Sequence, residues 1–266
     1  MANILTRARA HLGDFFREAK HELDTNGGHP LPLDLRTILV VSLICVLLTL
    51  FYYYARPNFY NRHLSDTVAA FLDMQKSAYR SLLPYIYWSI SSFTLRIFIP
   101  LMCILFWFRE SPRDYGFRLW KKGHGPIYLG LYLFMLPLLV MASYLPSFQS
   151  KYPFYRDATK SIWHFLGYEL TYGIQFFGVE AFFRGFMIYA LFKRFGYHSV
   201  VIMAIPYCMI HFNKPVPETL GAIIAGLALG FMAIYSKSWL PGALLHWSIG
   251  FTMDVLCIWH KGGWPE

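Results

Sequence analysis

Apolar residues in this chain gather into long stretches that are separated by shorter segments rich in polar residues, Gly and Pro. Seven stretches stand out, over residues 36–55, 82–108, 124–147, 161–193, 198–212, 219–236 and 240–260. Because a helix that crosses a bilayer needs about 20 mostly apolar residues, the pattern predicts an all-α fold. We expect a polytopic transmembrane bundle with seven or eight membrane helices. The higher count allows for stretch 161–193, which is too long for one straight crossing and is expected to be kinked, tilted or split.

The first 35 residues follow a different pattern. Between residues 3 and 23 the apolar side chains fall on one helical stripe, and the basic ones lie largely elsewhere: Arg7, Arg9, Arg17 and Lys20. An amphipathic helix of this kind is typical of an anionic membrane surface. The sequence therefore predicts an interfacial helix and linker over residues 1–35, followed by the transmembrane bundle over 36–266.

Composition agrees with a lipid environment. Only 15% of the residues are charged, whereas a soluble domain carries about 25%. The net charge of +9 raises the question of a nucleic-acid partner. However, the basic residues lie at the ends of apolar stretches, where the positive-inside rule and anionic lipid account for them. We therefore expect the lipid bilayer, and no nucleic acid, as a partner.

Ionisable side chains interrupt three of the apolar stretches. Glu180 and Arg184 lie one helical turn apart in stretch 161–193, His211 lies near the end of another, and His246 lies inside the last. Such groups cost about 2.5–3.5 kcal/mol each in a membrane and usually face a polar interior. Glu180 and Arg184 share a helix face, so a structural ion pair explains these two equally well. The four residues together predict a buried polar site.

Two further acidic residues belong to the same region. Glu218 lies just before a predicted helix, where it either complements the helix dipole or takes part in catalysis. Asp254 lies two turns beyond His246 and needs a partner, for which three residues are available: His246, Arg184 or Arg96.

Spacing along the helices limits how these groups can meet. Glu169 precedes Glu180 by about 16 Å of helix, which is too far for a carboxylate dyad, and we expect it to be interfacial or to pair helices. With strictly alternating spans, His211 and His246 differ by about 11 Å in depth. They converge if a loop dips into the bundle, since irregular backbone is tolerated there when it lines a polar cavity. We therefore predict that at least one of two loops is re-entrant, 213–218 or 236–239.

Three short motifs carry a family resemblance. Residues 179–185 read Val-Glu-Ala-Phe-Phe-Arg-Gly, residues 207–211 read Tyr-Cys-Met-Ile-His, and residues 246–250 read His-Trp-Ser-Ile-Gly. In this order they resemble the CPBP family of intramembrane proteases, named for CAAX prenyl proteases and bacteriocin-processing enzymes. The pattern of that family is Glu-Glu-x-x-x-Arg, then Phe-x-x-x-His, then His-x-x-x-Asn/Asp. The resemblance covers roughly residues 161–258.

The chain departs from the family pattern at three positions, one of which is Tyr207 in place of Phe. Val179 stands where the family has its first Glu, the residue assigned there as the base, and Gly250 stands where it has Asn or Asp. The resemblance implies that a neighbouring carboxylate takes over as the base, Glu180 first and Glu218 second. Asp254, one turn further on, is expected to replace the residue missing at position 250.

The resemblance implies an intramembrane endopeptidase that hydrolyses a peptide bond of a membrane-anchored or prenylated peptide or protein, near the C-terminus of that substrate. It also implies a multi-pass protein of the bacterial inner membrane. A prenylated C-terminus, a bacteriocin leader and a C-terminal sorting segment all fit as substrates.

Peptide hydrolysis needs an activated water molecule and a group that stabilises the oxyanion. A positioned carboxylate can act as the general base. Two imidazoles, His211 and His246, either orient the oxyanion or bind a divalent metal such as zinc together with a carboxylate. The sequence has no His-Glu-x-x-His pair, so metal dependence stays open at this point. The predicted catalytic set is Glu180, His211, His246, Arg184, Glu218 and Asp254.

Two other functions compete with proteolysis. The first is a catalytically inactive membrane scaffold or immunity protein of the same fold, which Val179 and Gly250 favour. The second is an ion- or proton-coupled transporter that uses Glu180, Asp254 and the histidines as a relay. Transporters often contain inverted repeats, and none is visible in the sequence.

Overall fold

Helices make up all the regular secondary structure in the part of the chain that the computed structural model describes, residues 14, 17, 34–120 and 123–263. Six helical stretches among these residues are long and apolar enough to cross a membrane: α2 (Leu35–Tyr54), Arg80–Phe108, α7 (Gly125–Ser143), Ile162–Phe195, α12 (Val216–Ser236) and α13 (Leu240–His260). A seventh apolar helix, α11 (His198–Met209), is shorter. The predicted all-α, polytopic fold is confirmed. The interfacial helix predicted at the N-terminus lies almost entirely outside the described residues.

Short elements connect or extend these stretches. Stretch 80–108 consists of η1 (Arg80–Leu82), α5 (Leu83–Phe93), η2 (Thr94–Phe98), α6 (Ile99–Met102) and η3 (Cys103–Phe108). The connections hold α3 (Pro57–His63), α4 (Ser65–Phe71), η4 (Pro112–Tyr115), α8 (Pro146–Lys151) and η5 (Arg156–Thr159). Several of these begin with proline, which fits the first turn of a helix because its missing N–H has no partner there.

The stretch that was too long for one straight crossing is a single continuous helix of 34 residues. It runs through α9 (Ile162–Glu180), the π-helical segment η6 (Ala181–Met187) and α10 (Ile188–Phe195). A π-helical turn adds a residue to the turn without breaking the helix, and such turns are frequent at functional sites. Here the π segment begins directly after Glu180 and contains Arg184.

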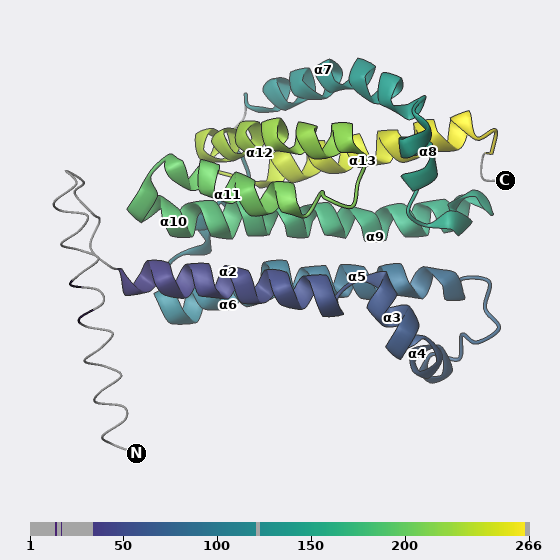
Figure 1. Cartoon of the computed structure of the whole chain (residues 1–266), viewed down its shortest axis with the longest axis horizontal. Helices are drawn as coiled ribbons and strands as arrows, with labels where there is room; N and C mark the ends of the chain where they lie inside the picture. The colour runs from purple at the N-terminus through teal and green to yellow at the C-terminus, as the bar shows by residue number, and fades with distance from the viewer. Residues whose placement is uncertain (1–13, 15–16, 18–33, 121–122, 264–266) are drawn as a thin grey trace. The chain divides into compact units, whose positions relative to one another are not determined.

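This long helix lies at the centre of the bundle (Figure 1). The α9 part packs against α5 on one side and α13 on the other, and α7 covers α13. Three phenylalanines of η6 are completely buried and form part of the main hydrophobic core: Phe182, Phe183 and Phe186. Burial of this many aromatic side chains fixes the helix in place, because each removes a large apolar area from its surroundings.

Helices α11 and α12 form a closely packed hairpin. A Cβ atom at Gly230 would lie 2.6 Å from Cγ1 of Val200, and one at Gly226 would lie 3.0 Å from the Tyr207 ring. Small residues at this spacing let helix backbones approach one another. The hairpin brings Tyr207, near the end of α11, against the central helix.

Candidate active site

Glu180 and Arg184 form an ion pair that is completely buried. Arg184 Nη1 donates a 3.0 Å hydrogen bond to Glu180 Oε1, and neither side chain has any exposed surface. Burying two charges is favourable only when their hydrogen bonds are satisfied. Glu180 Oε2, however, has no hydrogen-bond partner among the described residues. One oxygen of the carboxylate is therefore held, and the other is free to interact with a further group.

His246 reaches the same carboxylate from α13. Its Nδ1 lies 2.9 Å from Glu180 Oε1, and its ring packs 4.6 Å from the ring of Phe176 in α9. Because a carboxylate only accepts hydrogen bonds, Nδ1 carries the proton in a neutral imidazole and Nε2 is left as an acceptor. The side chain of His246 is 15% exposed, so the site has an opening on this side.

His211 joins the site through the ring of Tyr207. Its Nδ1 donates a 2.8 Å hydrogen bond to the backbone oxygen of Tyr207, which again leaves Nε2 as an acceptor. The Tyr207 ring lies 4.8 Å from the His211 ring and 6.3 Å from the His246 ring, and Arg184 Cζ lies 3.8 Å from its centroid. One aromatic ring thus touches three of the predicted site residues. Sequence reasoning noted Tyr207 only as a substitute for Phe and missed this central position.

The two histidines therefore lie against the same Tyr207 ring, His211 from the turn after α11 and His246 from α13. This is possible because α11 ends at Met209 and a turn over residues 210–215 leads into α12. No hydrogen bond joins His211 to Glu180 or His246 in the described part of the chain. Whether this turn is re-entrant stays a prediction.

Phe176 explains the glycine at position 250. A Cβ atom at Gly250 would lie 2.5 Å from Cζ of Phe176, a separation that side chains do not tolerate. The aromatic ring therefore occupies the space into which a longer residue at position 250 would extend, and the same ring packs on His246. Val179, another departure, is a buried part of the hydrophobic core.

Comparison with known families gives one result for this region. Residues 158–252 match the family model for type II CAAX prenyl endopeptidase Rce1-like. We refer to these residues as the Rce1-like segment, because they are similar to that family. The match confirms the resemblance seen in the motifs, and at family level it supports a CAAX-type intramembrane protease. Together with the apolar helices it identifies an integral, multi-pass membrane protein. No curated protein and no solved structure gave a significant match.

The donor atoms of the Rce1-like segment bear on whether it could hold a metal ion. A catalytic zinc ion is usually held by three protein ligands. Among the described residues, no group of three or more His, Cys, Asp or Glu side chains is arranged to hold a metal ion. The bonds at Nδ1 of His211 and of His246 leave Nε2 of each ring as an acceptor, so the bonds themselves do not exclude a metal. It is the arrangement of the donors among the described residues that does not fit a three-ligand metal centre.

Asp254 lies away from the carboxylate of Glu180. Its neighbour is Glu169, on α9, and both side chains are buried. None of the carboxyl oxygens of this pair has a hydrogen-bond partner among the described residues. Arg96, one of the partners considered from the sequence, instead places Cζ 3.4 Å from the centroid of the Phe51 ring. Glu169 and Asp254 thus lie in two helices that pack against each other, α9 and α13, and a helix-pairing role for Glu169 stays a prediction.

Glu218 lies in the first turn of α12 and binds two side chains. Tyr152 Oη donates to both of its carboxylate oxygens at 2.7 Å, and Lys214 Nζ lies 2.7 Å from Oε1. Burial raises the pKa of Tyr152 well above its usual value, with smaller contributions from neighbours that include Glu218, so the phenol stays protonated and keeps donating. Glu218 thus belongs to a cluster with Tyr152 and Lys214, and no hydrogen bond joins it to Glu180 among the described residues.

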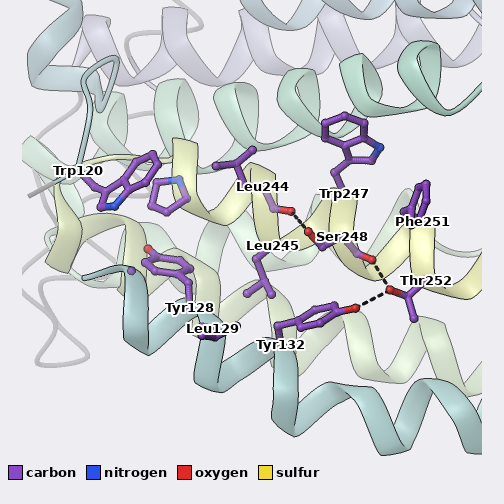
Figure 2. A pocket seen from close by; sticks show the side chains of 12 residues that line it. Trp120, Tyr128, Leu129, Tyr132, Leu244, Leu245, Trp247, Ser248, Phe251 and Thr252 are labelled. Atoms are coloured by element: carbon purple, nitrogen blue, oxygen red, sulfur yellow. Dashed lines mark hydrogen bonds between the residues drawn. The ribbon is translucent and has the colours of Figure 1, made fainter. Parts of the chain in front are cut away.

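A pocket of about 660 Å³ opens on another face of α13, against α7 (Figure 2). Its walls are mostly apolar or aromatic, and Leu245 and Trp247 flank His246 in sequence. The hydroxyls in its lining are already bonded: Tyr132 Oη to Thr252 Oγ1 at 2.8 Å, and Ser248 Oγ to a backbone oxygen. The pocket therefore offers its occupant a largely apolar surface.

Proposed function

We propose that this protein is an intramembrane endopeptidase that hydrolyses a peptide bond near the C-terminus of a prenylated, membrane-anchored substrate, in a bacterial inner membrane. The observation that carries the proposal is the asymmetry of Glu180 within the Rce1-like segment. Arg184 and His246 hold Oε1, while Oε2 is buried without a partner. A positioned carboxylate oxygen in apolar surroundings is suited to act as a general base.

The reaction follows from this geometry. A water molecule bound at Oε2 of Glu180 gives a proton to that oxygen, and the water oxygen attacks the carbonyl carbon of the scissile peptide. The resulting tetrahedral oxyanion then collapses as the carbon–nitrogen bond breaks. Glu180 returns the proton to the departing nitrogen, so the products are a carboxylic acid and an amine, and the carboxylate is restored.

Arg184 and the histidines support this step in different ways. Nε and Nη2 of Arg184 have no hydrogen-bond partner among the described residues, and the positive charge favours the developing oxyanion. His246 fixes the orientation of the carboxylate through Nδ1. Nε2 of His211 can accept the second proton of the attacking water in a hydrogen bond, because its Nδ1 is already bonded to the backbone.

The apolar pocket between α7 and α13 supports the choice of a lipid-modified substrate. Pockets of roughly 300–1,000 Å³ with apolar walls are the usual size for small ligands and cofactors, and this one holds about 660 Å³. A prenyl chain needs no hydrogen-bond partner, which suits a lining whose hydroxyls are bonded to one another or to the backbone.

The proposal is tested by incubating the purified protein in lipid with a farnesylated peptide and identifying products by mass spectrometry. Glu180→Gln is expected to lower kcat by at least about 100-fold, the usual contribution of a general base, and His246→Ala to lower it strongly as well. Asp66→Asn, a change to an exposed carboxylate, serves as the control. Cleavage that is absent from the wild type, or unchanged in Glu180→Gln, would contradict the proposal and favour a scaffold.

A further inference from the structure

Basic side chains crowd around the segment that joins α8 to η5. Lys214 Nζ lies 5.8 Å from the ring centroids of both Tyr152 and Phe154, and Lys151 Nζ lies 5.5 Å from that of Phe154. Lys261 Nζ donates to the backbone oxygen of Tyr152, and Arg156 Nη2 to that of Ser150, both at 2.6 Å. We refer to these four basic residues as the cationic cluster: Lys151, Arg156, Lys214 and Lys261.

Ion pairs within the described residues neutralise only part of the cationic cluster. Among the described residues its one ion pair joins Lys214 to Glu218. Lys261 and Arg156 bond to backbone oxygens, which orient the cations without neutralising them. Burial lowers the pKa of Lys151, and the positive charges of Lys214 and Arg56 lower it further. Four neighbouring cations with one ion pair among the described residues favour the binding of an anion.

The cluster adjoins the proposed active site. The backbone N–H of Lys214 donates to the carbonyl oxygen of His211 at 2.9 Å. Its side chain is 19% exposed, whereas that of Lys160, on the same end of the bundle, is 61% exposed. The Lys214 side chain is therefore largely buried near aromatic rings, next to the proposed active site.

We propose that the cationic cluster binds the C-terminal carboxylate of the peptide substrate, with Lys214 as the main contact. The inference rests on the proposed function, and it explains how cleavage would be kept close to a chain end. In a Cys-a-a-X sequence three residues follow the modified cysteine, and they span roughly 10 Å when extended. We expect a carboxylate held at Lys214 to leave the peptide bond after the cysteine about this far away, on the side of His211, whose carbonyl oxygen accepts from the Lys214 N–H.

A lipid phosphate is the other anion expected at a membrane surface. Three features favour the carboxylate: Lys214 is mostly buried, it already binds a carboxylate in Glu218, and it lies beside His211. A peptide carboxylate forms the same kind of ion pair as Glu218 and takes up little space.

The test measures binding separately from cleavage. Two farnesylated peptides ending in Cys-Val-Ile-Met, one with a free carboxylate and one with a C-terminal amide, are titrated against the Glu180→Gln variant in zwitterionic lipid nanodiscs. A hydrogen bond to a charged group contributes to the free energy of binding. We therefore expect the free acid to bind about 10- to 100-fold more tightly than the amide. Equal affinities, or no binding of either peptide, would overturn the inference.

Substitutions then show which residues are responsible for the preference for the free acid over the amide. Combined with Glu180→Gln, Lys214→Met and Lys151→Met are each expected to bring the ratio of the two affinities toward one, while Lys160→Met keeps it. A ratio that survives both of the first two changes overturns the assignment. The assignment is also overturned if the Lys214→Met variant no longer binds anionic lipid but keeps the preference for the free acid. That result would identify a binding site for a lipid headgroup.

Cleavage by the wild type distinguishes this inference from the proposed function. If the wild type binds the free acid selectively but does not cut it, the proposed protease activity fails and the carboxylate site stands. If it cuts acid and amide with equal kcat/KM and binds them equally, the protease stands and the carboxylate site fails.

Discussion

At the scale of single residues, the two oxygens of Glu180 have different surroundings. Arg184 and His246 fix Oε1, and Oε2 faces Gly242, where an added Cβ would lie 3.3 Å away. The glycine thus leaves room beside the oxygen that is proposed to activate water. The motif comparison places Glu180 in the site, but it gives no reason for a glycine at position 242, which is distant in sequence.

Gly242→Ala is expected to lower kcat by about 10- to 100-fold with little change in KM. The added methyl group crowds the proposed water site, and small displacements of reacting groups cost about this much. Gly221→Ala is the matched control, because nothing lies within 4 Å of a Cβ at that position of α12. Equal activity of the two variants in the peptide assay would contradict the proposed water site.

At the scale of elements, α9 contacts α13 through two polar clusters rather than one. Glu180 binds His246 in the first, and Glu169 lies against Asp254 in the second. Two buried carboxyl groups in contact cannot both carry a charge at low cost, so a shared proton is the arrangement that physical chemistry favours. We therefore expect the second cluster to contribute to the packing of α9 against α13.

Glu169→Gln is expected to stabilise the protein at pH 8 by about 1–3 kcal/mol, because the amide donates a hydrogen bond to Asp254 without requiring a bound proton. Glu169→Ala leaves Asp254 without this donor and is expected to destabilise. Thermal unfolding of the purified variants in detergent gives the comparison. A Glu169→Gln variant that is as unstable as Glu169→Ala would show that the two carboxyl groups do not share a proton.

At the scale of the whole molecule, the reacting groups come from three parts of the bundle that the fold brings together. Glu180 is the last residue of α9, directly before the π-helical segment of the central helix. His211 lies in the turn after α11, and His246 lies in α13. The Tyr207 ring lies among them. This arrangement supplies a base and a positive charge but no three-donor metal centre among the described residues.

Peptide cleavage is therefore expected to survive removal of divalent metals. The protein is dialysed against a zinc chelator, its metal content is measured, and the farnesylated peptide is assayed before and after. We expect less than a twofold loss of activity, since no step of the proposed reaction uses a metal. Loss of activity on dialysis that zinc restores would instead show that His211 and His246 rearrange into a metal site.

The sequence by itself determined the helices and the identity of the main polar residues. Apolar stretches and the turn-by-turn spacing of Glu180 and Arg184 are local patterns, and a helix follows from them because its hydrogen bonds are local. Only the tertiary structure decided which distant residues meet: Glu169 with Asp254, Glu218 with Tyr152, and Phe176 with the space at Gly250. These contacts join side chains that are tens of residues apart in sequence, and they depend on how the helices pack. The periodicity of a single helix therefore does not predict them.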